Sequence, residues 1–139
     1  MPTNDGSDLL LFISADGTAS GAKTAVELQG DLTINTGKSI TQTPYKNGQA
    51  AHHSKSGWSA TTTIGNQAPM GAGQALVFAA HDNETKTYFW VQNGETGGVE
   101  YEGECKIAIS TINAPTSGGT TSQITIAADG AEPTRSVAT

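Results

Sequence analysis

Two adjacent histidines, His52 and His53, are the first residues of the sequence whose types suggest chemistry. Successive residues of an extended chain point to opposite sides, so the two rings cannot easily share one metal ion. A zinc site would need further ligands, and the nearest ones in the sequence are His81 and Asp82. The pattern favours polar residues in a loop or at a subunit contact over a metal centre.

Covalent catalysis lacks a complete set of residues in this sequence. Cys105 falls on the apolar side of an alternating segment, where a thiol packs as a small hydrophobic group. There is no Gly-x-Ser-x-Gly elbow and no Gly-x-x-x-x-Gly-Lys-Ser/Thr phosphate loop. The serines lack a recognisable base and orienting residue. We therefore expect no enzymatic activity, no cofactor and no bound metal.

Glu100, Glu102 and Glu104 form a regular acidic row. Alternate residues of a strand lie about 7 Å apart on one face, which is too far for neighbouring members to hold one metal ion. The row is either an ordinary solvated face or a negatively charged surface that repels a polyanion. Both interpretations stay open at this point.

The composition describes one small acidic domain. The chain has 139 residues, of which 35% are hydrophobic and 14% charged, and its net charge is −6. We expect a single domain over residues 1–139 with a modest core. Seven basic residues spread along the chain do not form the patch that tight nucleic-acid binding requires.

The lone cysteine excludes an internal disulfide and a cysteine-based zinc cluster. No apolar run approaches the roughly 20 residues of a membrane-spanning helix. We expect a soluble chain, made in a reducing cytoplasm, with no membrane partner.

The elements that would position these residues are mostly strands. Residues 8–14 predict a buried strand, and residues 24–37 alternate so that Val26, Leu28, Gly30, Leu32 and Ile34 share one face. Residues 38–57 have no sustained period and predict a long loop, with a hairpin around Asn47-Gly48 as the alternative. Residues 58–64 predict the next strand.

The second half of the chain predicts one helix and three strands. Residues 69–84 form the helix, with Met70, Leu76, Val77 and Ala80 on one face. Residues 86–113 form a hairpin that turns within residues 93–98, residues 121–130 form a last strand, and residues 131–139 form a loose tail. The fold class is mainly β: an antiparallel β-sandwich or barrel with one flanking α-helix.

This order of elements resembles the major tail proteins, or tail tube proteins, of long-tailed non-contractile bacteriophages. The likeness rests on NDGSDLLLFIS, KTAVELQGDLTINTGKSI, SGWSATTTIG, GAGQALVFAAHDN and YFWVQNG, followed by the closing strands of residues 99–133. It covers roughly residues 5–133. No single motif is specific, and we expect no extra C-terminal immunoglobulin-like domain of the kind that some members have. A related gene-transfer particle or tube-forming secretion machine fits the same pattern.

The resemblance implies a structural subunit of a phage tail tube. Such subunits form hexameric rings whose inner sheets join into a continuous β-barrel, and the rings stack into a conduit for DNA delivery into the host. The implied partners are other copies of the chain, the tape measure, tail terminator and distal tail proteins, and DNA in transient, non-specific passage. The implied location is the virion tail, with the host cytoplasm during assembly.

The resemblance also assigns roles to particular residues. The long segment 38–57 corresponds to the family's loop to the adjacent ring, and its contact residues would be Thr41, Gln42, Tyr45, Lys46, Asn47, His52, His53 and Lys55. An acidic lumen would let DNA pass without binding, and the residues that could line it are Glu27, Asp31, Glu100, Glu102 and Glu104.

A small β-sandwich binding module, such as an adhesin or a carbohydrate-binding domain, is the alternative. It would need a flat aromatic platform, which Trp58, Tyr88 and Trp90 could supply if they are exposed. Strand alternation equally allows these residues to be core. An enzyme is a third class, against which the missing acid, base and nucleophile count.

Overall fold

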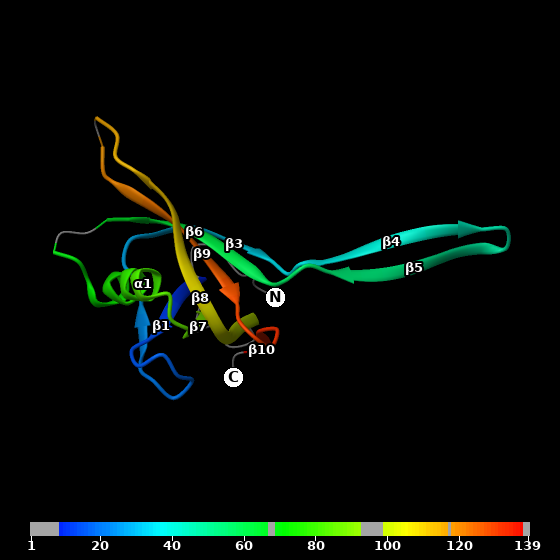
Figure 1. The fold of residues 1–139 in the computed structure, drawn as a ribbon, viewed down its shortest axis with the longest axis horizontal. Coiled ribbons are helices and arrows are strands. Elements are labelled where there is room, and N and C mark those ends of the chain that lie inside the picture. Colours follow the sequence, from blue (N-terminus) through cyan, green and yellow to red (C-terminus); the bar gives the residue numbers. More distant parts are fainter. Residues whose placement is uncertain (1–8, 67–68, 93–98, 117, 138–139) are drawn as a thin grey trace, which may run out of the picture.

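The structure is a computed structural model that describes residues 9–66, 69–92, 99–116 and 118–137 (Figure 1). These residues form ten strands and one helix. In chain order they are β1 (Leu10–Ser14), β2 (Lys23–Ala25), β3 (Gln29–Asn35), β4 (Lys38–Tyr45), β5 (Gly48–Lys55), β6 (Ser59–Gly65), α1 (Ala72–Asn83), β7 (Thr87–Gln92), β8 (Val99–Asn113), β9 (Thr121–Ala128) and β10 (Thr134–Val137).

One antiparallel sheet has the strand order β2-β1-β7-β8-β9-β6-β3, with β10 pairing to β8 beside it. The 15-residue strand β8 belongs to two parts of this sheet. Its second half, from Cys105 to Asn113, pairs with β9, and we call β3, β6, β9 and this part of β8 "half A". Its first half pairs with β7 and β10, and we call β2, β1, β7, β10 and this part of β8 "half B".

The sheet curls until β1, next to one end of the strand order, contacts β3 at the other end. Gln29 of β3 accepts a hydrogen bond from the backbone amide of Leu11 in β1 and donates one to the carbonyl of the same residue, each at 2.8 Å. One face of both halves therefore encloses a common core. The expected antiparallel sandwich or barrel with one flanking helix is confirmed.

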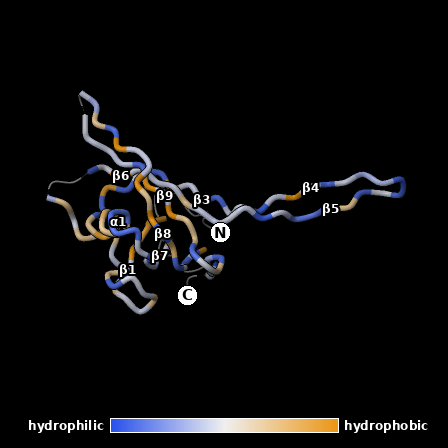
Figure 2. The backbone as a smooth tube through the Cα atoms, viewed as in Figure 1, coloured by the Kyte–Doolittle hydropathy of each residue, from blue (hydrophilic) through white to orange (hydrophobic). Residues whose placement is uncertain are grey.

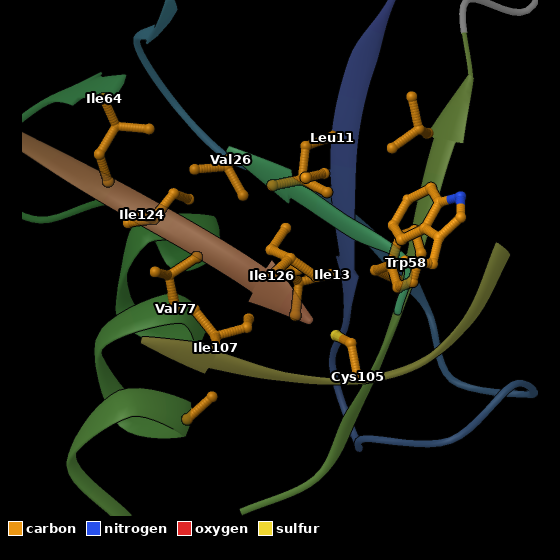
Figure 3. Packing of buried hydrophobic residues seen from close by; sticks show 14 residues of the cluster. Leu11, Ile13, Val26, Trp58, Ile64, Val77, Cys105, Ile107, Ile124 and Ile126 are labelled. Atoms are coloured by element: carbon orange, nitrogen blue, oxygen red, sulfur yellow. The ribbon is translucent and has the colours of Figure 1, made fainter. Parts of the chain in front are cut away.

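The core consists of alternate residues of β1, β6, β7, β8 and β9, together with Val26, Trp58 and one side of α1 (Figure 3). Ile124 and Ile126 of β9 and Ile107 of β8 point into it, and Val77 of α1 closes it. Trp58 stacks on Phe89 with ring centroids 5.3 Å apart, which joins half A to half B. Burial alternates along β6, and it alternates around Cys105 in β8, so the apolar side predicted for Cys105 is confirmed.

The expected continuous strand over residues 24–37 is wrong. β2 ends at Ala25, a turn occupies Glu27 and Leu28, and β3 begins at Gln29. Val26 is buried, whereas Leu28 is 57% exposed and has a left-handed backbone with φ of 56°. The two residues therefore do not share a face. The turn places the Glu27 carboxylate at the start of α1, which the alternation alone could not reveal.

Residues 38–57 are a hairpin rather than a long loop, so the alternative that Asn47-Gly48 suggested is the one that holds. β4 and β5 pair along their whole length, from Lys38 with Lys55 to Tyr45 with Gly48. The turn lies at Lys46 and Asn47, and Gly48 has φ of 146°. The hairpin forms its own two-stranded sheet and projects from the body along the long axis of the molecule (Figure 1).

Two further expectations need correction. The loose tail predicted for residues 131–139 is wrong where it is described, because Pro133 is buried and β10 pairs with the start of β8. The helix begins at Ala72, so Met70 lies outside it and is exposed instead of joining its apolar face. The turn predicted within residues 93–98 lies outside the described residues, although β7 and β8 pair as expected.

Candidate assembly surfaces

Half A has two open edges. In the described part of the chain, β3 pairs with β6 on one side and with no strand on the other. At the opposite edge, β7 pairs with β8 only as far as Cys105, which leaves residues 106–113 of β8 without a partner strand on that side. Unpaired edges of this length invite pairing with another chain.

His81 contacts the open edge of β8. Its Nδ1 accepts a hydrogen bond of 3.0 Å from the backbone amide of Ile109. This bond ties α1 to the strand and satisfies one donor of the edge. This bond could not be predicted from the sequence, where His81 is noticeable only as a neighbour of Asp82 in the expected helix.

The face of half A that points away from the core is polar and nearly free of charge. Its rows run across the strands, for example Thr33 beside Thr61, Thr61 beside Thr125, and Thr125 beside Ala108. The residues of this polar face are Asp31, Thr33, Asn35, Ser59, Thr61, Thr63, Thr121, Gln123, Thr125, Ala127, Lys106, Ala108, Ser110, Thr111 and Asn113. One acid and one base are its charged members, so its net charge is zero.

Glu27 and Asp31 do not form a stripe. Glu27 accepts hydrogen bonds from the backbone amides of Gly73 and Gln74, at 3.2 and 3.0 Å, in the first turn of α1. Asp31 lies exposed on the polar face of half A. The two carboxylates therefore belong to different surfaces.

Glu100, Glu102 and Glu104 do form a row, and each has a partner on or next to β7. Glu102 accepts hydrogen bonds from Trp90 Nε1 at 3.0 Å and from the Tyr88 hydroxyl at 3.3 Å. Glu104 forms an exposed ion pair of 2.8 Å with Lys86, and Glu100 accepts a bond from Gln92. The row lies on the same side of β8 as Lys106, but in half B.

The glutamates of this row help to raise the pKa values of two neighbouring groups, Tyr88 and Lys86. Partial burial raises the pKa of Tyr88, and the charge of Glu102 adds to the effect because it disfavours a nearby phenolate. The hydrogen bond and the charge of Glu104 raise the pKa of Lys86. The glutamate row is thus integrated with β7 rather than free in solvent.

The hairpin presents its side chains on two sides. His53 pairs with Ile40 and His52 pairs with Thr41, so the two rings lie on opposite faces as the extended chain predicts. Thr41, Gln42, Tyr45, Lys46, Asn47, His52, His53 and Lys55 are all exposed. Among the described residues, no group of three or more His, Cys, Asp and Glu side chains could hold a metal ion.

The root of the hairpin is a close contact between two glycines. Gly37 has φ of 72° and Gly57 has φ of 119°, both in the left-handed region. A side chain at Gly37 would collide with the backbone of Gly57. Lys38 forms an exposed ion pair of 3.2 Å with Glu132, which links the root to the body. A shallow hollow beside it is lined by Lys38, Lys55, Trp58 and Glu132.

The aromatic residues that could have formed a sugar platform are not exposed. Trp58 and Trp90 are 5% and 4% exposed, and Tyr88 is half-buried with its ring edge against Trp90. Lys23 lies 5.3 Å from the centroid of the Trp90 ring.

None of the helices in the described segments is long and apolar enough to traverse a bilayer.

The sequence matches no family model and no curated protein. Among solved structures, the chain is similar to the tail of an empty GTA particle determined with helical refinement and C6 symmetry. The TM-score is 0.76, the likeness covers 99% of this chain and 100% of that chain, and the identity is 14%. It is also similar to the SPP1 tail tube, with a TM-score of 0.71, 97% of this chain and 80% of that chain covered, and 14% identity. The chain therefore has the fold of these tail tube proteins.

Proposed function

We propose that this protein is the structural subunit of a tail tube, which assembles into stacked hexameric rings around a channel that delivers DNA into the host. The observation that carries the proposal is half A, a four-stranded antiparallel sheet whose two outer edges are both open. The tail-tube fold and the C6 symmetry of the GTA tail support the same function and copy number. The role is structural, without an enzymatic step.

Ring closure follows from the strand directions in half A. β3, β6, β9 and β8 alternate in direction, so β3 and β8 are antiparallel to each other. The open edge of β3 in one copy could therefore pair with residues 106–113 of the next copy on either side of Ile109, whose amide is bonded to His81, and continue the alternation. Because the two edges differ, the contact is heterologous and generates a ring when the rotation closes. Pairing would remove both exposed edges.

The inner wall of such a ring would be the polar face of half A. The opposite face is covered by α1 and half B, so the rest of the subunit would lie outside the barrel. A DNA channel needs few cations, and this face contributes Lys106 alone, balanced by Asp31. We retain Asp31 as the lumen acid best supported by its position. Glu100, Glu102 and Glu104 lie on the same side of β8 as Lys106, but in half B. Glu27 is directed at α1 instead of the polar face.

The hairpin would connect successive rings. An isolated two-stranded hairpin is marginally stable in water, and almost all side chains of β4 and β5 are exposed. Contact with the adjacent ring would order it and bury residues such as Thr41, Tyr45 and His52. In the assembled tail, the tape measure protein would occupy the channel, and the terminator and distal tail proteins would bind the two ends.

Electron microscopy of the purified protein over a concentration series, with light scattering, tests the function. We expect rings or hollow tubes to appear as concentration rises. A protein that stays monomeric under all conditions, also with fragments of an assembled tail added as seeds, would contradict the proposal. The glycan-binding alternative needs exposed aromatic rings, but Trp58 and Trp90 are buried.

The edge pairing has a test of its own. Thr33→Cys and Ala108→Cys place one thiol on each open edge of the same chain, and the native Cys105 is buried. A short bismaleimide should join neighbouring copies and give a ladder of covalent oligomers that ends at the ring size. Each single variant should give dimers at most. Oligomers that end at dimers for the double variant would exclude this edge pairing.

A further inference from the structure

Five of the seven large hydrophobic side chains that the fold leaves exposed among the described residues lie on the hairpin or at the opposite end of half A, while Leu10 and Val99 lie in half B. Seven are exposed in the described part of the chain: Leu10, Leu28, Ile40, Tyr45, Met70, Val99 and Ile112. Ile40 and Tyr45 lie on the hairpin. Leu28, Met70 and Ile112 lie at the other end, and we call these three residues the end patch. Figure 2 shows hydrophobic segments both on β4 and on the projecting β8–β9 arm.

Pairing and hydrogen bonds place two members of the end patch, Leu28 and Ile112, at the end of β6. Gly65 at the end of β6 donates a backbone hydrogen bond to the carbonyl of Leu28. Ile112 pairs with Ser122, whose hydroxyl is bonded to Asn66, the residue after β6. Met70 lies in the connection from β6 to α1. Leu28 and Ile112 therefore flank the end of β6 that is farthest from the hairpin, and Met70 follows that end along the chain.

Leu28 is poorly suited to the isolated chain. Its backbone is left-handed, with φ of 56°, a conformation that glycine and asparagine adopt far more readily than leucine. Its side chain is 57% exposed, so it gains little from burial within its own chain. A strained and exposed leucine indicates a contact with another molecule.

Charge identifies a second copy as a suitable occupant. Residues 38–57 contain Lys38, Lys46 and Lys55 and no acidic residue, so their net charge is +3. The whole chain has −6, which leaves −6 − 3 = −9 for the remainder. The hairpin of one copy is therefore attracted to the body of another, whereas two bodies repel each other.

We propose that the hairpin of one copy docks between two neighbouring copies of the chain in the next ring, so that Ile40 on one face of the hairpin covers the end patch of one copy and Tyr45 on the other face contacts the second copy. This inference rests on the proposed function and names the acceptor of its inter-ring contact. The hairpin and the end patch are different surfaces at opposite ends of the same strands, so the contact repeats head to tail and grows a linear stack.

The dimensions of the hairpin fit this contact. Strands of eight residues span about 26 Å, comparable to the strands of half A that separate the two ends. Ile40 and Tyr45 lie on opposite faces of the hairpin, because Ile40 pairs with His53 and Tyr45 with Gly48 at the alternate register. Burying both requires that the hairpin lie between two neighbouring copies of the next ring.

Leu28→Asn is the sharpest test. Asparagine tolerates the left-handed backbone, so the variant should fold at least as well as the original chain while its patch loses an apolar anchor. We expect the protein concentration needed for tube growth to rise about tenfold, as the loss of one buried leucine contact implies. Leu10→Asn, which removes an exposed leucine elsewhere, is the matched control and should leave tube growth unchanged.

The outcomes separate this inference from the function itself. Rings that form but no longer stack in a Leu28→Asn, Ile112→Ser double variant would support the docking site. Tubes that grow as readily as those of the original chain would overturn it and leave the tube function standing. Mixing a Leu28→Cys chain with an Ile40→Cys chain gives a second readout: a bismaleimide should yield cross-linked dimers of the two variants. The absence of such dimers in assembled tubes would also overturn it.

Discussion

Glu27 caps a helix from which it is separated by 45 residues of sequence or more. Its carboxylate accepts the backbone amides of Gly73 and Gln74, while the residue at the N-cap position, Gly71, offers no side-chain acceptor. In addition, the side-chain amide of Gln74 donates hydrogen bonds to the backbone carbonyls of Glu27 and Gly65. The turn after β2, the end of β6 and the start of α1 are thereby held as one unit.

Removing this carboxylate should weaken the fold. Glu27→Ala leaves two amides of the first helical turn without their acceptor and removes a negative charge from the helix N-terminus, so we expect a loss of about 1 kcal/mol in the free energy of unfolding. Asp82→Ala removes a carboxylate from the other end of the helix, where the dipole disfavours it, and should cost less than about 0.5 kcal/mol. Urea denaturation of the unassembled protein measures both. Equal losses would show that Glu27 is not a specific cap.

The hairpin root should depend on glycine at position 37. A Cβ there would meet the backbone of Gly57, whose neighbour Ser56 donates a 2.6 Å hydrogen bond to the carbonyl of Gly37. We expect Gly37→Ala to release β4 and β5 from their present direction while the core stays folded. Amide hydrogen exchange of residues 38–55 would rise, with exchange in β9 unchanged.

Gly130 supplies the control for that variant. It has φ of 92°, but a Cβ there would meet no atom. Gly130→Ala should therefore cost only the conformational strain of about 1 kcal/mol and leave hairpin exchange as it was. Hairpin protection that survives Gly37→Ala would refute the role of the glycine contact.

The core should respond most strongly at the junction of the two sheet halves. Phe89 is fully buried and stacks on Trp58, so Phe89→Ala removes burial and leaves a cavity, at a cost of about 3–5 kcal/mol. Ile40→Ala, on the exposed hairpin, should change the stability of the unassembled chain by less than about 0.5 kcal/mol. Thermal and urea unfolding compare them. A small effect of Phe89→Ala would mean that the halves do not depend on this stack.

Cys105 should make the fold sensitive to alkaline pH. Burial, followed by the charge of Asp129, raises the pKa of its thiol from 9.0 to about 12. The unfolded chain releases this proton above pH 9 while the folded chain keeps it, so the unfolded state is favoured as pH rises. The contribution is fully present below pH 9 and declines by up to about 1.4 kcal/mol per pH unit until about pH 12.

Comparison with Cys105→Ala isolates this effect from other groups that titrate at high pH. The difference in unfolding free energy between the two proteins should shrink between pH 8 and pH 10.5. The thiol should also resist maleimide at pH 8 until the protein unfolds. A constant difference between the two proteins, or rapid labelling of the folded chain, would contradict the burial-driven shift.

The alternation of apolar and polar residues within single segments predicted which face of a strand lies in the core. The core sides of β6 and β8 follow from the spacing of Ala60 and Ile64 and of Cys105 and Ile107. The hairpin turn was signalled by Asn47-Gly48. The fold class and the likeness to tail tube proteins followed from the order of these elements, and the structural comparisons confirm that fold.

What the sequence missed depends on contacts between distant segments. The alternation of residues 24–37 continues through Leu28, but the helix N-terminus draws Glu27 into a turn and breaks the strand. The tail looked unstructured because its pairing partner is β8, some thirty residues earlier. The open edges of half A and the bond from Ile109 to His81 are likewise properties of strand order, which no single segment encodes. The assigned contact and lumen residues stay predictions.

The even number of strands in half A means that strand direction alternates around a closed ring whatever the number of copies. The even strand number therefore does not determine how many copies form the ring. The curvature of the joined sheet has to determine it. The register irregularities of half A, between Gln29 and Leu32 and between Ile109 and Thr111, lie in its two outermost strands. Because a bulge bends and twists its strand, the bore of the channel would be set at the seams between subunits rather than in their cores.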